Sequence, residues 1–192
     1  MTLLAPGYQE ADLERVRTLA GEVKQPEDLR RVLDALGYEE DWRANYAIKS
    51  VRASLNSARI TCIDAAILSY GLLELLFPQV ERRLLAIHRR DGNGEECGHC
   101  VALYVRDGKV GSFSKSSYPG LGHREPVHKD GAEVALTYAD AYVKMGFTPL
   151  YFGMARLEEV APDLDWRGSS APLNVLSERL QARYQYSFGL AS

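Results

Sequence analysis

The chain has little cysteine and no long stretch free of charged or polar side chains. Its three cysteines in 192 residues are an odd number, which argues against a disulfide framework. The longest apolar segment, residues 63–77, is interrupted by Asp64, Ser69 and Glu74, which indicates a buried core helix and not a membrane span. The first residues lack the positively charged start and the apolar segment of a signal peptide. We therefore expect a cytoplasmic protein with reduced thiols.

Positive charge is not in excess either. The chain has 23 Lys and Arg against 26 Asp and Glu, for a net charge of −3, so it lacks the excess of basic residues that is typical of nucleic-acid-binding proteins. Its hydrophobic fraction of 46% and its length are typical of one globular domain with a sizeable core. We expect a single domain over residues 1–192 that binds neither nucleic acid nor a membrane, and the sequence leaves its oligomeric state open.

Helical periodicity dominates the first part of the chain. Apolar residues at helical spacing predict a helix over 11–23, a second that begins at Pro26 and a third over 39–55. Together they predict a helical N-terminal layer formed by residues 1–57. Residues 58–192 contain the candidate chemistry and are expected to form the core of the domain.

Strand and helix patterns follow one another in this second part. The nearly all-apolar segment from Cys62 to Phe77 predicts a buried helix. The Asp107-Gly108 pair predicts a type I′ hairpin turn. Residues 115–131 predict a loop long enough to be a binding loop or a lid, whose Lys, Arg and His side chains either bind a substrate anion or are solvated. Further strands are expected over 83–89, 97–105, 110–114 and 148–156, and helices over 132–144 and 172–184.

Two residues have the chemistry of a nucleophilic cysteine site. Cys62 opens the apolar helix, where unpaired N–H groups and the helix dipole favour a thiolate. His99 lies near the start of the strand that leads into the hairpin. A neighbouring imidazole can take the proton of a thiol and later protonate a leaving amine.

The turn also predicts the register of the hairpin. Val101 is expected opposite Ser114, and His99 opposite Ser116. Because side chains alternate along strands, His99 should share one face with Ser112, Ser114 and Ser116. We therefore expect a serine hydroxyl, that of Ser114 or Ser116, to accept the N–H of His99 and to orient the ring.

This arrangement resembles the transglutaminase-like branch of the papain-type cysteine enzymes. In that family a Cys opens a buried helix, a His begins a strand that turns through a hairpin, and an Asp on the return strand orients the His. The resemblance covers about residues 58–116, and Ser114 stands at the position of the family's Asp. It implies an α+β fold of papain/transglutaminase-like type, with the buried Cys helix packed on an antiparallel sheet. It also implies that Cys62 is the nucleophile and His99 the general acid/base.

The expected function is a thiol-dependent acyl-transfer enzyme. It would hydrolyse or aminolyse an amide or peptide bond through a thioester on Cys62, as a cysteine protease, an amidase or a transglutaminase does. We expect no metal and no organic cofactor. A neutral hydroxyl at Ser114 or Ser116 stabilises an imidazolium less than a carboxylate does. The identity of the substrate cannot be inferred from the sequence.

Two other functions stay open. The missing Asp favours a catalytically inactive relative that serves as a binding or scaffold domain. The Cys97-Gly-His-Cys100 segment is half of a zinc site, with Cys62, His88 or His99 as possible further ligands. However, the sequence has no second Cys/His pair at metal spacing, and Cys97 and Cys100 should point to opposite faces of a strand.

Overall fold

A six-stranded antiparallel sheet forms the centre of the computed structural model, which describes residues 6–40, 46–168, 175–183 and 186–188. The strand order is β6-β5-β4-β3-β7-β8. The strands are β3 (Arg82–Arg90), β4 (Glu96–Arg106), β5 (Lys109–Phe113), β6 (Arg124–His128), β7 (Thr148–Ala155) and β8 (Tyr186–Ser187). Two short strands, β1 (Gly37–Tyr38) and β2 (Arg59–Ile60), pair in parallel as a separate sheet.

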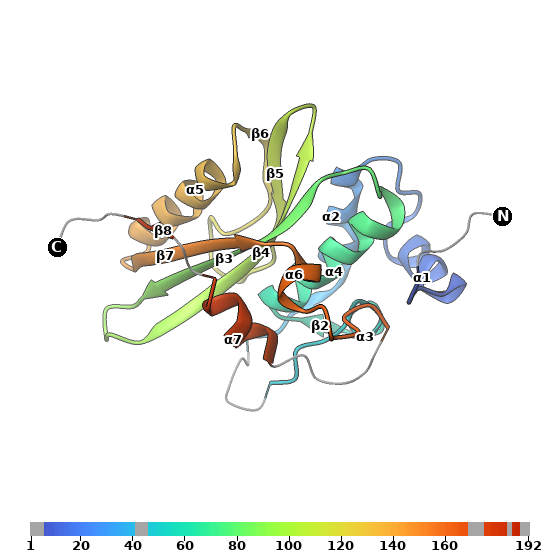
Figure 1. Ribbon diagram of the computed structural model, residues 1–192, viewed down its shortest axis with the longest axis horizontal. Helices are drawn as coiled ribbons and strands as arrows, with labels where there is room; N and C mark the ends of the chain where they lie inside the picture. The colour runs from blue at the N-terminus through green and yellow to red at the C-terminus, as the bar shows by residue number, and fades with distance from the viewer. Residues whose placement is uncertain (1–5, 41–45, 169–174, 184–185, 189–192) are drawn as a thin grey trace.

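Helices pack against both faces of the large sheet (Figure 1). Helix α4 (Cys62–Leu76) lies on one face together with the N-terminal helices, and α5 (Gly131–Lys144) lies on the other. The remaining helices are α1 (Glu10–Ala20), the short 3-10 helix η1 (Pro26–Asp28), α2 (Leu29–Ala35), α3 (Val51–Leu55), α6 (Leu157–Val160) and α7 (Val175–Gln181). None of the helices in the described ranges is long and apolar enough to cross a membrane.

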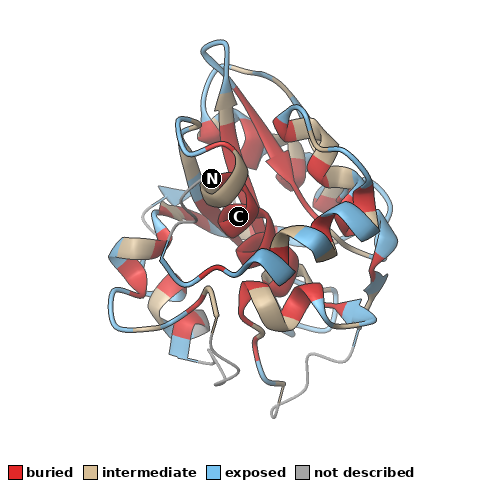
Figure 2. Cartoon of the chain, turned by 90° about the vertical axis from the view of Figure 1, so that its right-hand side faces the viewer, coloured by how far each residue is buried: buried red, intermediate tan, exposed pale blue. Residues whose placement is uncertain are grey.

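The sheet separates two hydrophobic cores. Alternate residues of β4 belong to different cores: Cys100 packs in the core that contains Leu68 of α4, and Val101 in the core that contains Val134 of α5. In Figure 2 the buried segments lie at the centre of the molecule and the exposed ones on its outer turns. Helix α4 is buried nearly all round because the sheet covers one side of it and the N-terminal helices cover another.

The start of α4 is fixed by a capping box. Thr61 Oγ1 accepts a hydrogen bond from the Asp64 backbone N–H at 3.4 Å, and the Asp64 carboxylate accepts one from the Thr61 N–H at 3.0 Å. Asp64 is fully buried and also accepts hydrogen bonds from the Lys49 N–H and the Tyr46 hydroxyl. These contacts determine where the first residue of the helix, Cys62, is held.

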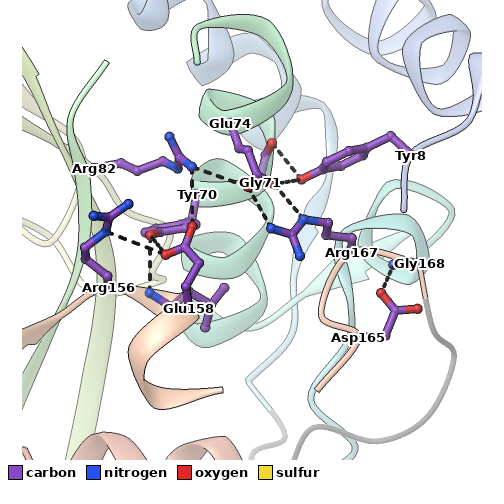
Figure 3. Close-up of polar contacts among 11 residues, drawn as sticks. Tyr8, Tyr70, Gly71, Glu74, Arg82, Arg156, Glu158, Asp165, Arg167 and Gly168 are labelled. Atoms are coloured by element: carbon purple, nitrogen blue, oxygen red, sulfur yellow. Dashed lines mark hydrogen bonds and ion pairs between the residues drawn. The ribbon is translucent and has the colours of Figure 1, made fainter. Parts of the chain in front are cut away.

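A polar network fixes the other half of α4 (Figure 3). The Arg167 guanidinium donates two hydrogen bonds to the Glu74 carboxylate, each at 2.7 Å. The Tyr8 hydroxyl lies 2.9 Å from the Gly71 carbonyl oxygen and 3.1 Å from Glu74 Oε2, and Arg82 Nη2 lies 3.4 Å from Glu74 Oε1. The helix is thereby tied to chain segments near both ends of the sequence.

The expected α+β architecture is confirmed: a helix that opens at Cys62 packs on an antiparallel sheet, with N-terminal helices beside it. The hairpin turn is also confirmed, because Asp107 and Gly108 have φ values of 52° and 72°. The expected final helix is present as α7, whose neighbouring residues 172–174 and 184 lie outside the described ranges.

The expected helix over 39–55 is wrong at the described residues 39–40 and 46–50. Residues 46–50 are not helical, and only α3 is. The backbone of Lys49 and the hydroxyl of Tyr46 bind the distant Asp64, and these hydrogen bonds hold the segment in a non-helical path. Residues 41–45 lie outside the described part of the chain.

The expected loop over 115–131 and the expected strand over 110–114 also need correction. Strand β6 lies within the loop and pairs with β5. The β4–β5 ladder follows the expected register, with Val105 opposite Val110, but it ends where Ala102 pairs with Phe113. The expected pairing of His99 with Ser116 is therefore not formed, and no strand among the described residues pairs with the first half of β4 on that edge.

Candidate functional site

The candidate site is a cavity of about 420 Å³ beside this unpaired edge of β4. It is lined by the start of α4, the end of β3, the first half of β4, the connection between β5 and β6, and α5. Cys62, His99 and Ser116 all line it. The structure thus brings the expected nucleophile and the expected base to one cavity from distant parts of the chain.

Cys62 lies in the first turn of α4 and is partly exposed. Burial of its sulfur raises the pKa of the thiol above the ordinary value. The N–H groups of Cys100 and Ile63 lower the pKa by hydrogen bonding, and the negative charge of Asp64 raises it. Burial is the largest effect, so the thiol is protonated at neutral pH.

His99 is buried on the face of β4 that α5 covers, with its ring 5.7 Å from the ring of Tyr138. Its Nε2 lies 2.8 Å from Ser114 Oγ, which lies 2.6 Å from the carbonyl oxygen of Leu121. A carbonyl only accepts, so the single hydrogen of the Ser114 hydroxyl goes to Leu121. Nε2 of His99 must then be the donor, and Nδ1 is left unprotonated.

The charge state of His99 follows from its surroundings. Burial lowers the pKa of the imidazole to about 3, and the positive charges of Arg89 and Arg124 add to this shift. At neutral pH the ring is therefore neutral and able to accept a proton at Nδ1. The site combines a protonated thiol with a neutral imidazole.

Cys62 and His99 enter the cavity from opposite sides of the sheet. Cys62 belongs to α4, which packs on the face that contains Cys100, while His99 lies on the face that contains Val101. No hydrogen bond between Cys62 and His99 is formed within the described ranges. Proton transfer between them therefore needs a water molecule or a movement when ligand enters.

The remaining expected site residues have other partners. Ser116 Oγ accepts the Tyr118 N–H at 3.1 Å and does not bind His99. Cys97 and Cys100 point to opposite faces of β4, as alternation requires. Across the residues that the structure describes, no three His, Cys, Asp or Glu side chains are grouped as a metal site.

Cations of the β5–β6 connection and of β6 are used within the protein. Lys115 Nζ donates a hydrogen bond to the Leu33 carbonyl at 2.6 Å. Arg124 Nη2 donates one to the Gly120 carbonyl at 2.5 Å, and its guanidinium carbon lies 4.3 Å from the centre of the Tyr138 ring. These contacts fix the connection against the body of the domain, so these two side chains are not simply solvated.

Arg89 also lies in the cavity wall and was not predicted from the sequence. Only 7% of this residue is exposed, and its guanidinium carbon lies 3.7 Å from the centre of the Phe147 ring. In the sequence Arg89 stands within a run of basic residues that looks solvated. Alternation along β3 was the available signal, because Arg89 follows Leu85 and Ile87, which are both buried in the core under α5.

Comparison of the chain with models of known protein families gives no match, and comparison with curated proteins gives none either. The function is therefore argued from the cavity alone.

Proposed function

We propose that this protein is a thiol-dependent acyl-transfer enzyme with a papain/transglutaminase-like core. Cys62 is its nucleophile, and an amide or peptide is its substrate. The observation that supports this best is the orientation of His99, whose Nε2–H is bound by Ser114 while the free Nδ1 belongs to a ring that lines the same cavity as Cys62. That is the protonation pattern that a general base needs.

The reaction begins with both side chains neutral. The Cys62 thiol gives its proton to Nδ1 of His99, through a water molecule or after a movement on ligand entry, as the sulfur attacks the carbonyl carbon. The amine then leaves with the proton from the imidazolium, and an acyl thioester remains on Cys62. Water or a second amine then attacks the thioester and gives its proton to His99. The C–S bond breaks, the acyl product leaves, and the Cys62 thiolate takes the proton from His99, which restores the neutral thiol and imidazole.

Ser114 takes the position that a carboxylate has in the resembling family. Its hydroxyl holds the ring through the hydrogen bond from Nε2 but adds no negative charge. The imidazolium formed during attack is therefore less stabilised than it would be beside an Asp, and we expect slow turnover. Ser114 is a positioning residue in this proposal.

Acylation by p-nitrophenyl acetate tests the proposal. The purified protein is mixed with the ester at neutral pH, and the acetyl group is located by peptide mass spectrometry. We expect it on Cys62, and we expect His99→Ala to slow its formation by about 100-fold or more, the usual contribution of a general base. Ser114→Ala should slow it less, because the base remains.

Cys97→Ser is the matched control, because Cys97 is a second partly exposed thiol of the same cavity wall. This variant should be acetylated at Cys62 at the rate of the unaltered protein. Acetylation of Cys62 at the rate of a free thiol, with no effect of His99→Ala, would exclude the enzyme.

A binding domain without catalysis is the second candidate. It is favoured by the neutral state of both side chains, because burial raises the pKa of Cys62 and lowers that of His99 to about 3. In that case a ligand occupies the cavity, and the ester experiment shows no His99-dependent acylation.

A further inference from the structure

Arg89 is a buried cation in the wall of the candidate site. It lies near the end of β3, has 7% exposure and lines the cavity together with Cys62 and His99. No ion pair joins it to a carboxylate of any residue within the described ranges. A buried guanidinium without a carboxylate partner is costly, and such groups are usually paired.

Aromatic rings surround the Arg89 guanidinium instead. Its central carbon lies 3.7 Å from the ring centre of Phe147, 5.2 Å from that of Tyr142 and 5.4 Å from that of Tyr118. These rings offer cation–π contacts, which stabilise a cation but do not neutralise its charge. Tyr118 and Tyr142 also line the cavity, so the positive charge stands in its wall.

The effect of this charge extends to neighbouring groups of the cavity. Burial raises the pKa of both Tyr142 and Cys97, and the charge of Arg89 acts against that rise in each. Cys62 lies close enough to influence Tyr142 in turn. Arg89, Tyr142 and Cys62 line the same cavity, so a ligand that binds Arg89 there shares the cavity with the Cys62 thiol.

Glu96 is the acidic side chain among the described residues of the cavity lining, and it is already bound by others. One carboxylate oxygen lies 2.9 Å from His88 Nε2, and the other accepts hydrogen bonds from Arg90 at 2.5 and 3.1 Å. Cys97 lies opposite Arg89 in the β3–β4 ladder, and Glu96 is the residue before Cys97. Because neighbouring residues of a strand point to opposite faces of the sheet, the Glu96 side chain is not on the face of Arg89. The described residues of the cavity lining therefore offer Arg89 no unoccupied carboxylate.

We infer that Arg89 binds a carboxylate group of the ligand that fills the cavity. A guanidinium matches a carboxylate with two parallel hydrogen bonds, and its charge is balanced by one negative charge. A phosphate dianion needs a second cation, and the described residues of the lining include no Lys and no Arg besides Arg89. That the ligand is the substrate rests on the proposed function, whereas the binding itself does not.

A carboxylate bound at Arg89 restricts the substrates to amides that bear a free carboxylate near the bond to be attacked. An acylated amino acid, or a peptide bond close to a C-terminus or to an acidic side chain, has this chemistry. Arg89 would then orient the substrate, so that its carbonyl carbon meets Cys62 and not Cys97.

Binding of N-acetylglycine, compared with its neutral amide, tests this inference. Both probes, and inorganic phosphate, are titrated into 15N-labelled Cys62→Ala protein, and the amide shifts of residues lining the cavity are followed. We expect the carboxylate to bind at least about tenfold more tightly than the amide, as a charge-assisted hydrogen bond implies. Equal affinity of the acid and the amide, or tighter binding of phosphate, would overturn the assignment.

Variants at two arginines of β3 locate the effect. Arg89→Met should abolish the preference for the acid, and Arg89→Lys should weaken it because the paired geometry is lost. Arg83→Met is the matched control, since Arg83 is an exposed residue of the same strand, paired with Glu81 and outside this cavity. Unaltered binding in Arg89→Met would refute the role of Arg89. Because Cys62→Ala protein has no nucleophilic thiol, these titrations measure binding alone. Their outcome is therefore independent of whether the acyl-transfer proposal holds.

Discussion

At the scale of single residues, a chain of hydrogen bonds determines the chemistry of His99. The Leu121 carbonyl can only accept, which turns the Ser114 hydroxyl toward it and obliges Nε2 of His99 to donate. The direction of the Ser114–Leu121 hydrogen bond thus determines the direction of the His99–Ser114 hydrogen bond. A neutral, fully enclosed imidazole is the result, and its cost should be visible in the stability of the protein.

That cost predicts an acid-sensitive stability. The pKa of His99 is lowered from 6.5 to about 3, so between these values the unfolded chain binds a proton that the folded protein does not. Unfolding is therefore favoured as the pH falls below about 6.5, by up to about 1.4 kcal/mol per pH unit. Urea unfolding of the native protein and of His99→Gln, from about pH 7 to about pH 4, measures the effect. The free energy of unfolding of the native protein should fall more steeply with decreasing pH than that of His99→Gln. Parallel curves for the two proteins would contradict the prediction.

Part of this site could be predicted from the sequence. The Asp107-Gly108 turn sets the register, so counting along two strands places His99 on one face with Ser114 and Ser116, and of these two Ser114 forms the hydrogen bond. Arg89 could not be recognised in the same way, because its sequence neighbours are other arginines and the rings that enclose it come from α5 and the loops beside it. Contacts within a hairpin are local, and contacts across a cavity are not.

At the scale of secondary structure elements, Gly71 shows how closely α4 is packed. A methyl group there would lie 2.4 Å from Val51 Cγ2 and 2.8 Å from the Tyr8 hydroxyl. Alanine normally stabilises a helix by up to about 1 kcal/mol relative to glycine. At this position we expect Gly71→Ala to destabilise the protein by about 1–3 kcal/mol, as overpacking does.

Chemical unfolding followed by circular dichroism measures the change at Gly71. Gly92→Ala is the control, because nothing lies within 4 Å of a methyl group at that turn position. A more stable Gly71→Ala protein would mean that α4 and α3 can move apart at low cost.

Elements with strong local signals were predicted correctly, and those that depend on distant partners were not. Helix α4 has a cap at Thr61 and a proline two residues after its last residue, Leu76, so its bounds could be inferred. Strand β6 contains Pro126 and pairs with β5 at the edge of the sheet, and its own residues have no clear alternation. The segment around Lys49 has helical spacing, but its Lys49 N–H donates a hydrogen bond to the distant Asp64 carboxylate.

At the scale of the whole molecule, Glu74 connects parts of the chain that are far apart in sequence (Figure 3). Glu74→Gln leaves Arg82 and Arg167 without the charge that they share. We expect a loss of about 2–4 kcal/mol, somewhat below the cost of breaking a fully buried pair because Arg167 is partly exposed. Hydrogen exchange should increase near residue 8 and near residue 167.

Glu81→Gln is the control for this substitution. Glu81 pairs with Arg83 at the surface, where both side chains are more than half exposed, so the change should cost about 1 kcal/mol or less. Equal effects of the two substitutions would show that the Glu74 network adds no more stability than a surface pair.

The order of strands in the sheet bears on how the chain folds. Strands β3, β4 and β5 each pair with the next strand in the sequence, whereas β7 pairs with β3 only after α5 has crossed one face. Short loops close at lower entropic cost than long ones, so the consecutive strands should pair first. His99 and Ser114 would then meet in the earliest folding events, Cys62 would join them when α4 packs on the finished sheet, and the contacts of Tyr8 and Arg167 with Glu74 would form last.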